Sequence, residues 1–473
     1  MADVLVVGDG VLGRSIAFAL AAAEPRLRVV VAGRRAAGAS RAAGAMLGVL
    51  GEVTAASVRS RHGRLRLAMA VDAARRWPAW RAAVRETAGS AAPAQDGYGY
   101  GTFVLLNAVS SRIDEQSLAA IAAAGRAHAL PVEDIDPAAV PGLQPLDNDR
   151  PLRALHLPRE AYLDARRWLA TLDAALAALP GVIRTPSGRL EAAGSRYTLR
   201  TRTSTVTAPV LVLAAGAWTT PLHDSLDAHH TALPVVCAEG TAVSLTAPGP
   251  LPAVLRTPNR AYACGLHAVP QADGTWYVGA SASPALTPGA RPPAAGLPFL
   301  LDAAFGQLHH GLATARLHRL HHGNRPVGLD GHPLLGPGGR PGLYLATGTH
   351  RDGLHASPLI AQELAHTILT GTASTWLAPW QPERTPISDW TREEAIEEAA
   401  LQHQALAAES RMRPPLTGTW PQQLTDAYRQ QMTTAYDRLP HGFVLPPDLA
   451  PLAYEHGPQL AKLISRYLAG RRQ

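Results

Sequence analysis

The fold of this chain is decided by Asp3-Val4-Leu5-Val6-Val7-Gly8-Asp9-Gly10-Val11-Leu12-Gly13. Its apolar start predicts a short buried strand, and its glycines predict a tight turn. Ser15 to Ala23 is rich in Ala, Ile, Phe and Leu and predicts a helix, and Arg28 to Ala32 predicts a second strand. The glycine motif therefore stands in the β–turn–α–β setting that a dinucleotide site requires.

Each glycine of this turn has its own physical role. The first permits the tight turn, the second lets the backbone approach a pyrophosphate, and the third lets the helix and the strand pack closely. The N-terminus of the helix then presents its N–H groups and the positive end of its dipole to the phosphates. We therefore predict a dinucleotide site at the start of the chain.

One expected part of that site is missing. The second strand should end in an acidic residue that holds the ribose hydroxyls, but Gly33 stands there, and Arg34 and Arg35 follow it. Taken alone, these arginines leave open a 2′-phosphate and hence NADP. We expect Arg34 or the segment around Ser40 to replace the missing carboxylate, with weaker retention of the dinucleotide as the consequence.

The composition limits the class of protein. A chain of 473 residues is long enough for about two or three domains. It has no long apolar run and Asp3 interrupts its start, so we expect a cytoplasmic protein without a membrane span. The net charge of +7 comes from scattered arginines, with Lys462 the single lysine, and does not indicate a nucleic-acid partner. We expect no metal, because there are only two cysteines and the histidines between His309 and His322 lack metal-site spacing.

Further along the chain, helix and strand signals alternate. Arg66 to Arg75, Asp114 to Ala129 and Ala303 to Leu320 are predicted to be helical. Val206 to Ala214 ends in a continuous apolar run typical of a buried parallel strand, and residues 231–283 predict antiparallel strands.

The last hundred residues differ from the rest. Thr391-Arg392-Glu393-Glu394 is a capping box that predicts the start of a helix. Apolar side chains at helical spacing follow, around Met432 and around Ile464. We interpret this region as a helical extension that packs on the main body.

These signals predict an α/β (α+β two-domain) fold. A Rossmann-like dinucleotide-binding domain is expected to combine with a substrate domain built on a mixed or antiparallel sheet, followed by a helical C-terminal extension. We assign residues 1–60, 150–225 and 322–372 to the dinucleotide-binding domain, which the motifs below identify as FAD-binding, 61–149 and 226–321 to the substrate domain, and 373–473 to the extension.

The choice of FAD over NADP rests on four further segments. One is the small-residue segment Gly38-Ala39-Ser40-Arg41-Ala42-Ala43-Gly44-Ala45-Met46-Leu47-Gly48, and another is Leu211-Val212-Leu213-Ala214-Ala215-Gly216-Ala217-Trp218. Leu233-Pro234-Val235 and the segment from Gly323 to Gly336, with its Asn324-Arg325-Pro326 and Asp330-Gly331, complete the set. In this order the motifs resemble the D-amino-acid oxidase superfamily of flavoproteins, and within it the glycine oxidases.

The resemblance implies a set of site residues. Arg325 would grip the substrate carboxylate, because a planar guanidinium binds a carboxylate bidentately, and Arg351 would be a second arginine near the substrate. The backbone near Gly353 and Leu354 would face the flavin. The residues implied to bind FAD are Gly8, Gly10, Val11, Leu12, Gly13, Arg34, Arg35, Ser40, Arg41, Ala43, Gly44, Ala45, Met46, Ala215, Gly216, Trp218, Arg325, Arg351, Asp352, Gly353 and Leu354.

One departure from the family pattern concerns the substrate. The strand that bears a carboxylate-contacting tyrosine in the family resembles Leu266-His267-Ala268-Val269-Pro270, so His267 stands in the tyrosine's place. Tyr262 lies five residues earlier and could substitute for it. His267 could accept a larger or additional acidic group, or could equally be a packed core histidine.

The activity implied is oxidation of a carboxylate-bearing amine such as glycine or an N-substituted glycine. Noncovalent FAD would take a hydride, the imine would be hydrolysed, and O2 would be reduced to hydrogen peroxide. Two alternatives remain open. One is an oxidase of a larger amine, such as an N–N-linked lysine–glycine conjugate cleaved to hydrazinoacetate, and the other is an FAD dehydrogenase with a protein or quinone acceptor. A homo-oligomer is also compatible with the sequence.

Overall fold

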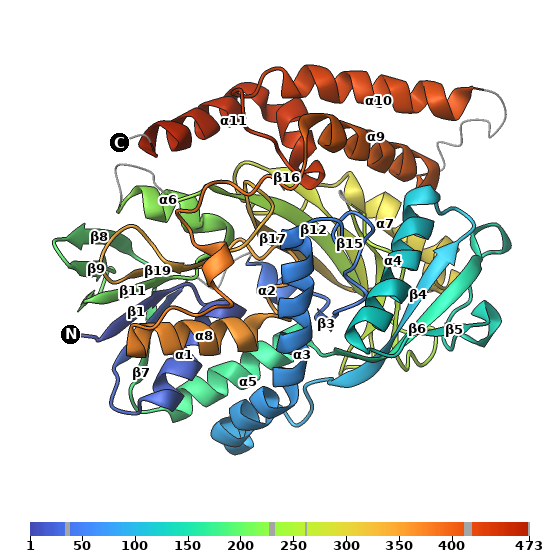
Figure 1. Cartoon of the computed structure of the whole chain (residues 1–473). Helices are drawn as coiled ribbons and strands as arrows, with labels where there is room; N and C mark the ends of the chain where they lie inside the picture. Colours follow the sequence, from blue (N-terminus) through green and yellow to red (C-terminus); the bar gives the residue numbers. More distant parts are fainter. Residues whose placement is uncertain (34–37, 227–231, 261–262, 411–418, 472–473) are drawn as a thin grey trace.

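The protein is described by a computed structural model in which two sheets lie side by side, with helices around them (Figure 1). The described residues are 1–33, 38–226, 232–260, 263–410 and 419–471. The predictions for Arg34, Arg35 and Tyr262 therefore lie outside the described residues.

The first sheet contains the N-terminal strand and runs in the order β18-β19-β11-β1-β2-β7. Its strands are parallel except at the β18–β19 pair. Val4 to Val7 pair with both Val29 to Ala32 and Val210 to Leu213, as a doubly wound dinucleotide fold requires. The strands are β1 (Val4–Val7), β2 (Val29–Gly33), β7 (Val182–Pro186), β11 (Val210–Leu213), β18 (Leu334–Pro337) and β19 (Leu343–Thr347).

The strands of this sheet point apolar side chains to both faces, and helices of the main body cover one of them. Val4, Val6 and Val31 pack into one core with Ile16 and Trp168. The helices of this core are α1 (Val11–Ala23), α3 (Arg61–Ala88), α5 (Ala165–Ala178) and α8 (Ser357–Thr370). The whole of α3 was expected in the substrate domain, but its buried tryptophans Trp77 and Trp80 belong to this core.

The second sheet runs in the order β16-β12-β15-β14-β13-β4-β6-β3, with β17 on β12 and β5 on β6. It is mixed, since β13 and β4 are parallel whereas the other described pairs are antiparallel. The strands are β3 (Met46–Leu47), β4 (Gly99–Asn107), β5 (Glu133–Ile135), β6 (Pro151–Tyr162), β12 (Val235–Leu245), β13 (Val254–Arg256), β14 (Ala263–Pro270), β15 (Trp276–Ser281), β16 (Ser283–Ala285) and β17 (Leu317–Gly328).

Two expectations for this region need correction. Residues 150–162 were assigned to the FAD-binding domain, but β6 pairs with β4 in the second sheet. The helix predicted from Ala303 to Leu320 is wrong at both ends. The helix is α7 (Gly296–Gln307), and β17 begins at Leu317 because this segment pairs along the whole of β12. Tertiary pairing has overridden the local apolar pattern.

Smaller elements complete the main body. Strands β8 (Arg189–Ala193), β9 (Arg196–Arg200) and β10 (Thr205–Ala208) form a separate antiparallel sheet beside the first. The remaining helices are α2 (Ala39–Ala42), α4 (Arg112–His128) and α6 (Thr219–Asp224).

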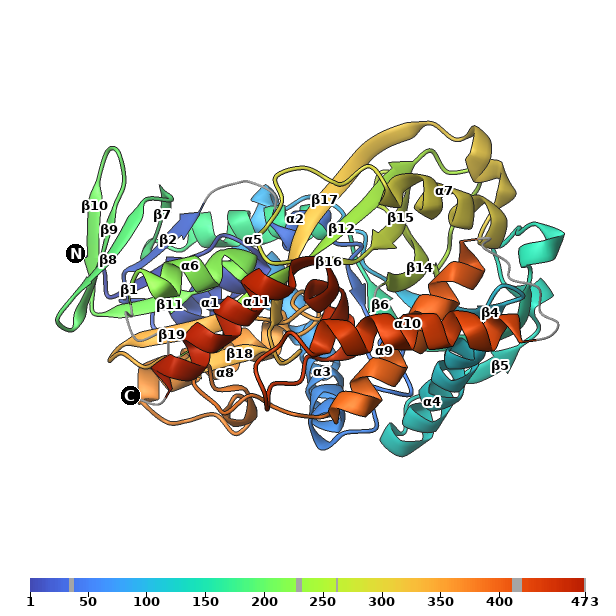
Figure 2. The same cartoon turned by 90° about the horizontal axis from the view of Figure 1, so that it is seen from above.

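The C-terminal extension consists of α9 (Arg392–Glu409), α10 (Trp420–Tyr436) and α11 (Ala450–Gly470). The predicted capping box is confirmed, with Thr391 and Glu394 each bonded to the other's backbone. Figures 1 and 2 show the extension lying along one side of the molecule, from α6 to α4. Tyr436 and Ile464 join a core with Leu5 and Leu211 of the first sheet, so the extension is packed on the main body.

The described ranges lack two kinds of feature. None of their helices has the length and apolarity needed to cross a bilayer. The same ranges contain no group of three or more His, Cys, Asp or Glu side chains that could hold a metal ion.

Candidate active site

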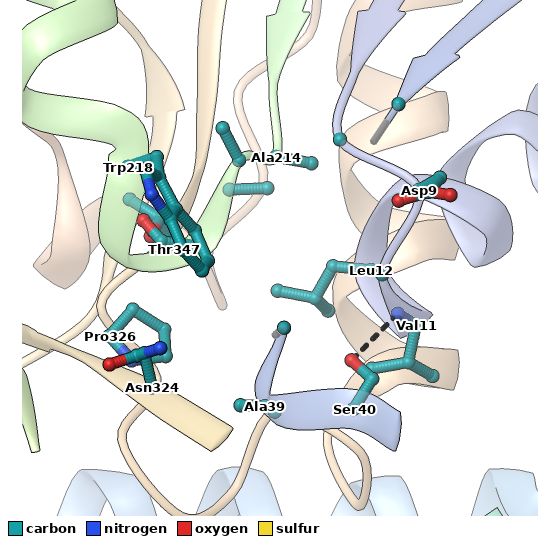
Figure 3. Close-up of a pocket in the computed structure, with 18 of the residues that line it drawn as sticks. Asp9, Val11, Leu12, Ala39, Ser40, Ala214, Trp218, Asn324, Pro326 and Thr347 are labelled. Carbon is teal, nitrogen blue, oxygen red and sulfur yellow. Dashed lines mark hydrogen bonds between the residues drawn. The ribbon is translucent and has the colours of Figure 1, made fainter. Parts of the chain in front are cut away.

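A cavity of about 1060 Å³ is lined by elements of both large sheets. Figure 3 shows part of it, where Val11 and Leu12 of α1 lie across the cavity from Trp218 and Thr347. Ligand pockets usually measure about 300–1,000 Å³. The cavity is therefore large enough for an extended cofactor together with a small substrate.

The glycine turn forms one wall of this cavity. Gly8 has a φ of +129°, and a Cβ atom added to it would lie 2.1 Å from the carbonyl oxygen of Ala214. A Cβ atom on Gly13 would lie 1.8 Å from the oxygen of Gly8. The glycines thus bring β1, β11 and α1 together, and α1 begins at the cavity, where Val11 N–H donates to Ser40 Oγ at 3.0 Å (Figure 3). This backbone cradle at a helix N-terminus fits a pyrophosphate.

Most of the predicted site residues that fall within the described ranges line this one cavity. Gly13 does not, because it packs beneath the turn, and Asp352 does not, because it pairs with Arg66 at 2.5 Å and faces a second cavity. The predicted residues that line the first cavity are Gly8, Gly10, Val11, Leu12, Ser40, Arg41, Ala43, Gly44, Ala45, Met46, Ala215, Gly216, Trp218, His267, Arg325, Arg351, Gly353 and Leu354.

Arg325 extends from β17 over a glycine of the neighbouring strand. Its Nη1 donates to the carbonyl oxygen of Ser281 at 3.0 Å. A Cβ atom on Gly240 of β12 would lie 2.4 Å from the same Nη1. The absence of a side chain at Gly240 therefore makes room for the guanidinium, and the carbonyl of Ser281 fixes its orientation at the cavity wall.

Arg351 reaches the same cavity from the loop after β19, where its Nη2 donates to the carbonyl oxygen of Arg260 at 2.9 Å. The preceding residue, His350, has a φ of +52°, and Ala45 across the cavity has a φ of +58°. Left-handed backbone at non-glycine residues is costly and often marks functional sites. Burial, followed by Arg351, Arg325 and a third arginine, holds the pKa of His350 well below its usual value, which indicates a positive potential suited to a carboxylate.

His267 is buried on β14 and stacks on Tyr277 of β15, with ring centroids 5.9 Å apart. Burial lowers the pKa of His267 to about 4, so the ring is neutral at pH 7. Its Nδ1 lies 2.8 Å from the carbonyl oxygen of Gly265. A carbonyl only accepts, so Nδ1 carries the proton and Nε2 is left as an acceptor.

Tyr277 is a site residue that the sequence did not reveal. Its hydroxyl donates to the carbonyl oxygen of Ala42 at 2.6 Å, which ties β15 to the small-residue segment. The sequence predicted strands in this region, but which side chain of β15 faces the cavity depends on strand pairing.

Glu52 also lines the cavity, and Arg256 holds it ionised. Arg256 Nη1 donates to Glu52 at 2.8 Å and Asn259 Nδ2 donates to it at 2.7 Å. Burial opposes the charge of Glu52, but Arg256 and then Arg351 outweigh burial and lower the pKa of Glu52 to about 2. A carboxylate of such low pKa is a poor proton acceptor near neutral pH, and neutral His267 is the better one.

A second cavity of about 190 Å³ adjoins the first and shares Glu52, His350 and Arg351 with it. Its outer wall includes Glu398 of α9 and Asp448 of the loop before α11. Burial raises the pKa of Asp448. The C-terminal extension therefore closes a polar chamber beside the candidate substrate end.

Residues 3–367 match the protein family described as FAD dependent oxidoreductase. The match covers most of the chain, and the chain belongs to this family. It is an FAD-dependent oxidoreductase, and the glycine cradle and the cavity size fit FAD. Residues 368–473, which include the whole extension, lie beyond the match.

Individual relatives make the class narrower. Glycine oxidase of Geobacillus kaustophilus is 27% identical over 386 residues, which cover 81% of this chain and 97% of the relative. The bifunctional protein ThiO/ThiG of a Nostoc species is 24% identical over 81% of this chain. The aligned part is 55% of that relative, so this chain spans about half its length.

Two solved structures are similar over most of this chain. The crystal structure of glycine oxidase from Geobacillus kaustophilus has a TM-score of 0.68 and 26% identity, covering 82% of this chain and 99% of the other. Iminodiacetate oxidase from Chelativorans sp. BNC1 has a TM-score of 0.66 and 21% identity, covering 81% and 100%. The second likeness shows the fold alone.

Proposed function

We propose that this protein oxidises a carboxylate-bearing amine of the glycine or N-substituted glycine type. The observation that carries the proposal is the pair Arg325 and Arg351, which come from different elements and line one cavity. Each guanidinium has one nitrogen oriented by a backbone carbonyl. Two oriented guanidinium groups match the charge of a carboxylate in a cavity that also holds FAD.

The chain's own residues would bind and orient this substrate. Arg325 takes the carboxylate in a bidentate contact, and Arg351 adds positive potential on the same side. The neutral Nε2 of His267 accepts an N–H of the amine, because its Nδ1 is the protonated nitrogen. Bound FAD would supply the two-electron oxidation of the carbon beside the amine nitrogen, with O2 as the final electron acceptor and hydrogen peroxide as the product.

A substituent on the amine nitrogen has a place in this arrangement. The second cavity adjoins the first at Glu52, His350 and Arg351, and it is polar. This favours an N-substituted glycine over glycine itself. The similarity to glycine oxidase of Geobacillus kaustophilus supports glycine as the core of the substrate.

The test is an amine panel with two readouts, flavin bleaching without oxygen and peroxide formation in air. The panel contains glycine, N-methylglycine, iminodiacetate, an N–N-linked lysine–glycine conjugate, and methylamine as the control without a carboxylate. We expect bleaching and peroxide with a carboxylate-bearing amine, and none with methylamine. Turnover of methylamine alone, or bleaching by none of the amines, would refute the proposal, and bleaching without peroxide would identify a dehydrogenase.

A further inference from the structure

At the cavity wall, the end of β2 lies so close to the glycine turn that only one of them can carry a side chain there. Gly33 ends β2 where dinucleotide folds usually carry a ribose-binding acid. Parallel pairing sets Val7 beside Ala32, so the residues that follow meet at the carboxyl ends of both strands. A Cβ atom added to Gly33 would lie 2.3 Å from Cγ of Asp9. The carboxyl group of Asp9 therefore fills the space that a side chain at position 33 would need.

The Asp9 carboxylate faces the cavity and accepts no hydrogen bond from the described residues. Its side chain is 16% exposed and lines the cavity, on the same wall as Val11 and Leu12 (Figure 3). The nearest cationic nitrogens are Nη2 of Arg184 at 3.8 Å and Nη2 of Arg14 at 3.9 Å. Both distances exceed hydrogen-bond length, and within the described part of the chain no other group donates to Asp9.

The two arginines hold the charge of Asp9 without occupying its oxygens. Arg14 is fully buried in α1, and its Nε lies 3.0 Å from Asp173. Arg184 also pairs with Asp173. Their closer partner is thus Asp173, and Asp9 receives only their longer-range attraction. An ionised carboxylate in a cavity wall is costly unless it accepts hydrogen bonds. The two neighbouring hydroxyl groups of a ribose can each donate one.

We propose that Asp9 binds the adenosine ribose of FAD by accepting a hydrogen bond from its hydroxyl groups. Asp9 of the glycine turn thus takes the role that an acidic residue at the end of β2 usually has. Position 33 is a glycine because a larger residue would collide with Asp9. The connection between β7 and β8 supports this assignment of the adenosine end, since Ser187 N–H donates to the carbonyl oxygen of Gly33 and both residues line the cavity. A negative charge here also disfavours the 2′-phosphate of NADP.

The test measures the affinity for FAD and for FAD analogues that lack the 2′- or 3′-hydroxyl of the adenosine ribose. Flavin fluorescence follows release from the holoenzyme and from its reconstituted forms. We expect Asp9→Ala to weaken FAD binding about tenfold to a hundredfold. The unsubstituted protein should lose a similar factor with at least one analogue, whereas Asp9→Ala should bind that analogue and FAD equally.

Two further variants keep the test falsifiable if Asp9→Ala folds poorly. The double variant Asp9→Gly with Gly33→Glu removes the Asp9 side-chain atoms that a side chain at position 33 would meet and returns a carboxylate to the end of β2, so it should restore the preference for FAD over the analogue. Glu191→Gln is the control, because Glu191 lines the same cavity but already accepts from Arg200 at 3.0 Å, and it should leave the preference unchanged. The proposal is overturned if Asp9→Ala keeps the preference, or if the unsubstituted protein has none.

Discussion

The two ends of the cavity are built in different ways. The cofactor end consists of backbone, where Gly8 and Gly13 bring two strands and a helix within touching distance. The substrate end consists of side chains, with Arg325, His267 and Arg351 brought from three separate elements. A backbone site depends on the absence of side chains at fixed spacing, whereas a side-chain site depends on strand pairing. The two ends should therefore fail independently when they are mutated.

The largest effect is expected at the backbone end. Gly8→Ala places a methyl group 2.1 Å from a backbone oxygen, at a φ of +129° that disfavours any side chain. Backbone cannot move aside as a flexible side chain can, so we expect Gly8→Ala to be purified without FAD, as measured by the flavin absorbance. Gly274→Ala is the matched control, since Gly274 lies outside the cavity lining and has a left-handed φ of +80° with nothing within 4 Å of the added methyl. Equal FAD content in both variants would contradict this account.

The next effect belongs to the substrate end alone. Arg325→Ala removes the proposed carboxylate partner and should lower kcat/KM by a factor equivalent to about 2–5 kcal/mol. FAD content should stay unchanged, because the glycine cradle is intact. Arg325→Lys keeps the charge but not the planar guanidinium, so its kcat/KM should lie between those of Arg325→Ala and the unsubstituted protein. If kcat/KM is unaffected while FAD is lost, Arg325 acts on the cofactor and the independence of the two ends is wrong.

The difference between the ends explains what the sequence could predict. The dinucleotide fold and most of its lining residues follow from Gly8, Gly10 and Gly13, because the spacing of glycines is itself the structural requirement. The capping box at Thr391 was equally visible, since its partners lie three residues apart. Requirements of this kind involve residues close together in the sequence, so they can be predicted from the sequence alone.

Other parts depended on contacts far apart in the chain. Tyr277 faces the cavity only because β15 pairs with β14 and β12 in one register. Asp9 was visible as a residue between two glycines, but its proximity to Gly33 requires the parallel pairing of β1 and β2. Leu317 to Leu320 looked helical, and pairing with β12 makes them a strand. In each case, tertiary pairing decided which side chain reached the site.

The ends should also differ in their response to acid. Burial lowers the pKa of His267 to about 4, while an unfolded histidine titrates near 6.5. The unfolded chain therefore binds the proton first, and the stability contributed by neutral His267 is present above pH 6.5 and is lost as pH falls toward 4. This loss reaches about 2 kcal/mol by pH 5. At the cofactor end, burial lowers the pKa of Arg14 to about 10, far outside this range.

Urea unfolding at pH 7 and pH 5 measures this difference. The charged groups that face His267 are Arg256, Glu52 and Arg325, and the pKa of Glu52, about 2, lies below this interval. His267→Phe should lose less stability between the two pH values than the unsubstituted protein does. Other buried histidines titrate in both proteins, so their share cancels in the comparison. An identical pH dependence would mean that His267 is not the buried neutral group described.

The smallest effect should come from a buried contact between the extension and the substrate end. Glu409 at the end of α9 accepts from Arg260 and from Gln307 Nε2, and Arg260 also pairs with Asp114 at 2.6 Å. Because the Arg260 carbonyl holds Arg351, Glu409→Gln should raise KM a few-fold at nearly constant kcat and cost about 1–2 kcal/mol of stability. Glu397→Gln is the control on the same helix, since its pair with Arg429 is half exposed and should contribute less than about 1 kcal/mol. A lower melting temperature with unchanged KM would make the contact purely structural, and a KM effect shared by Glu397→Gln would assign it to the whole helix.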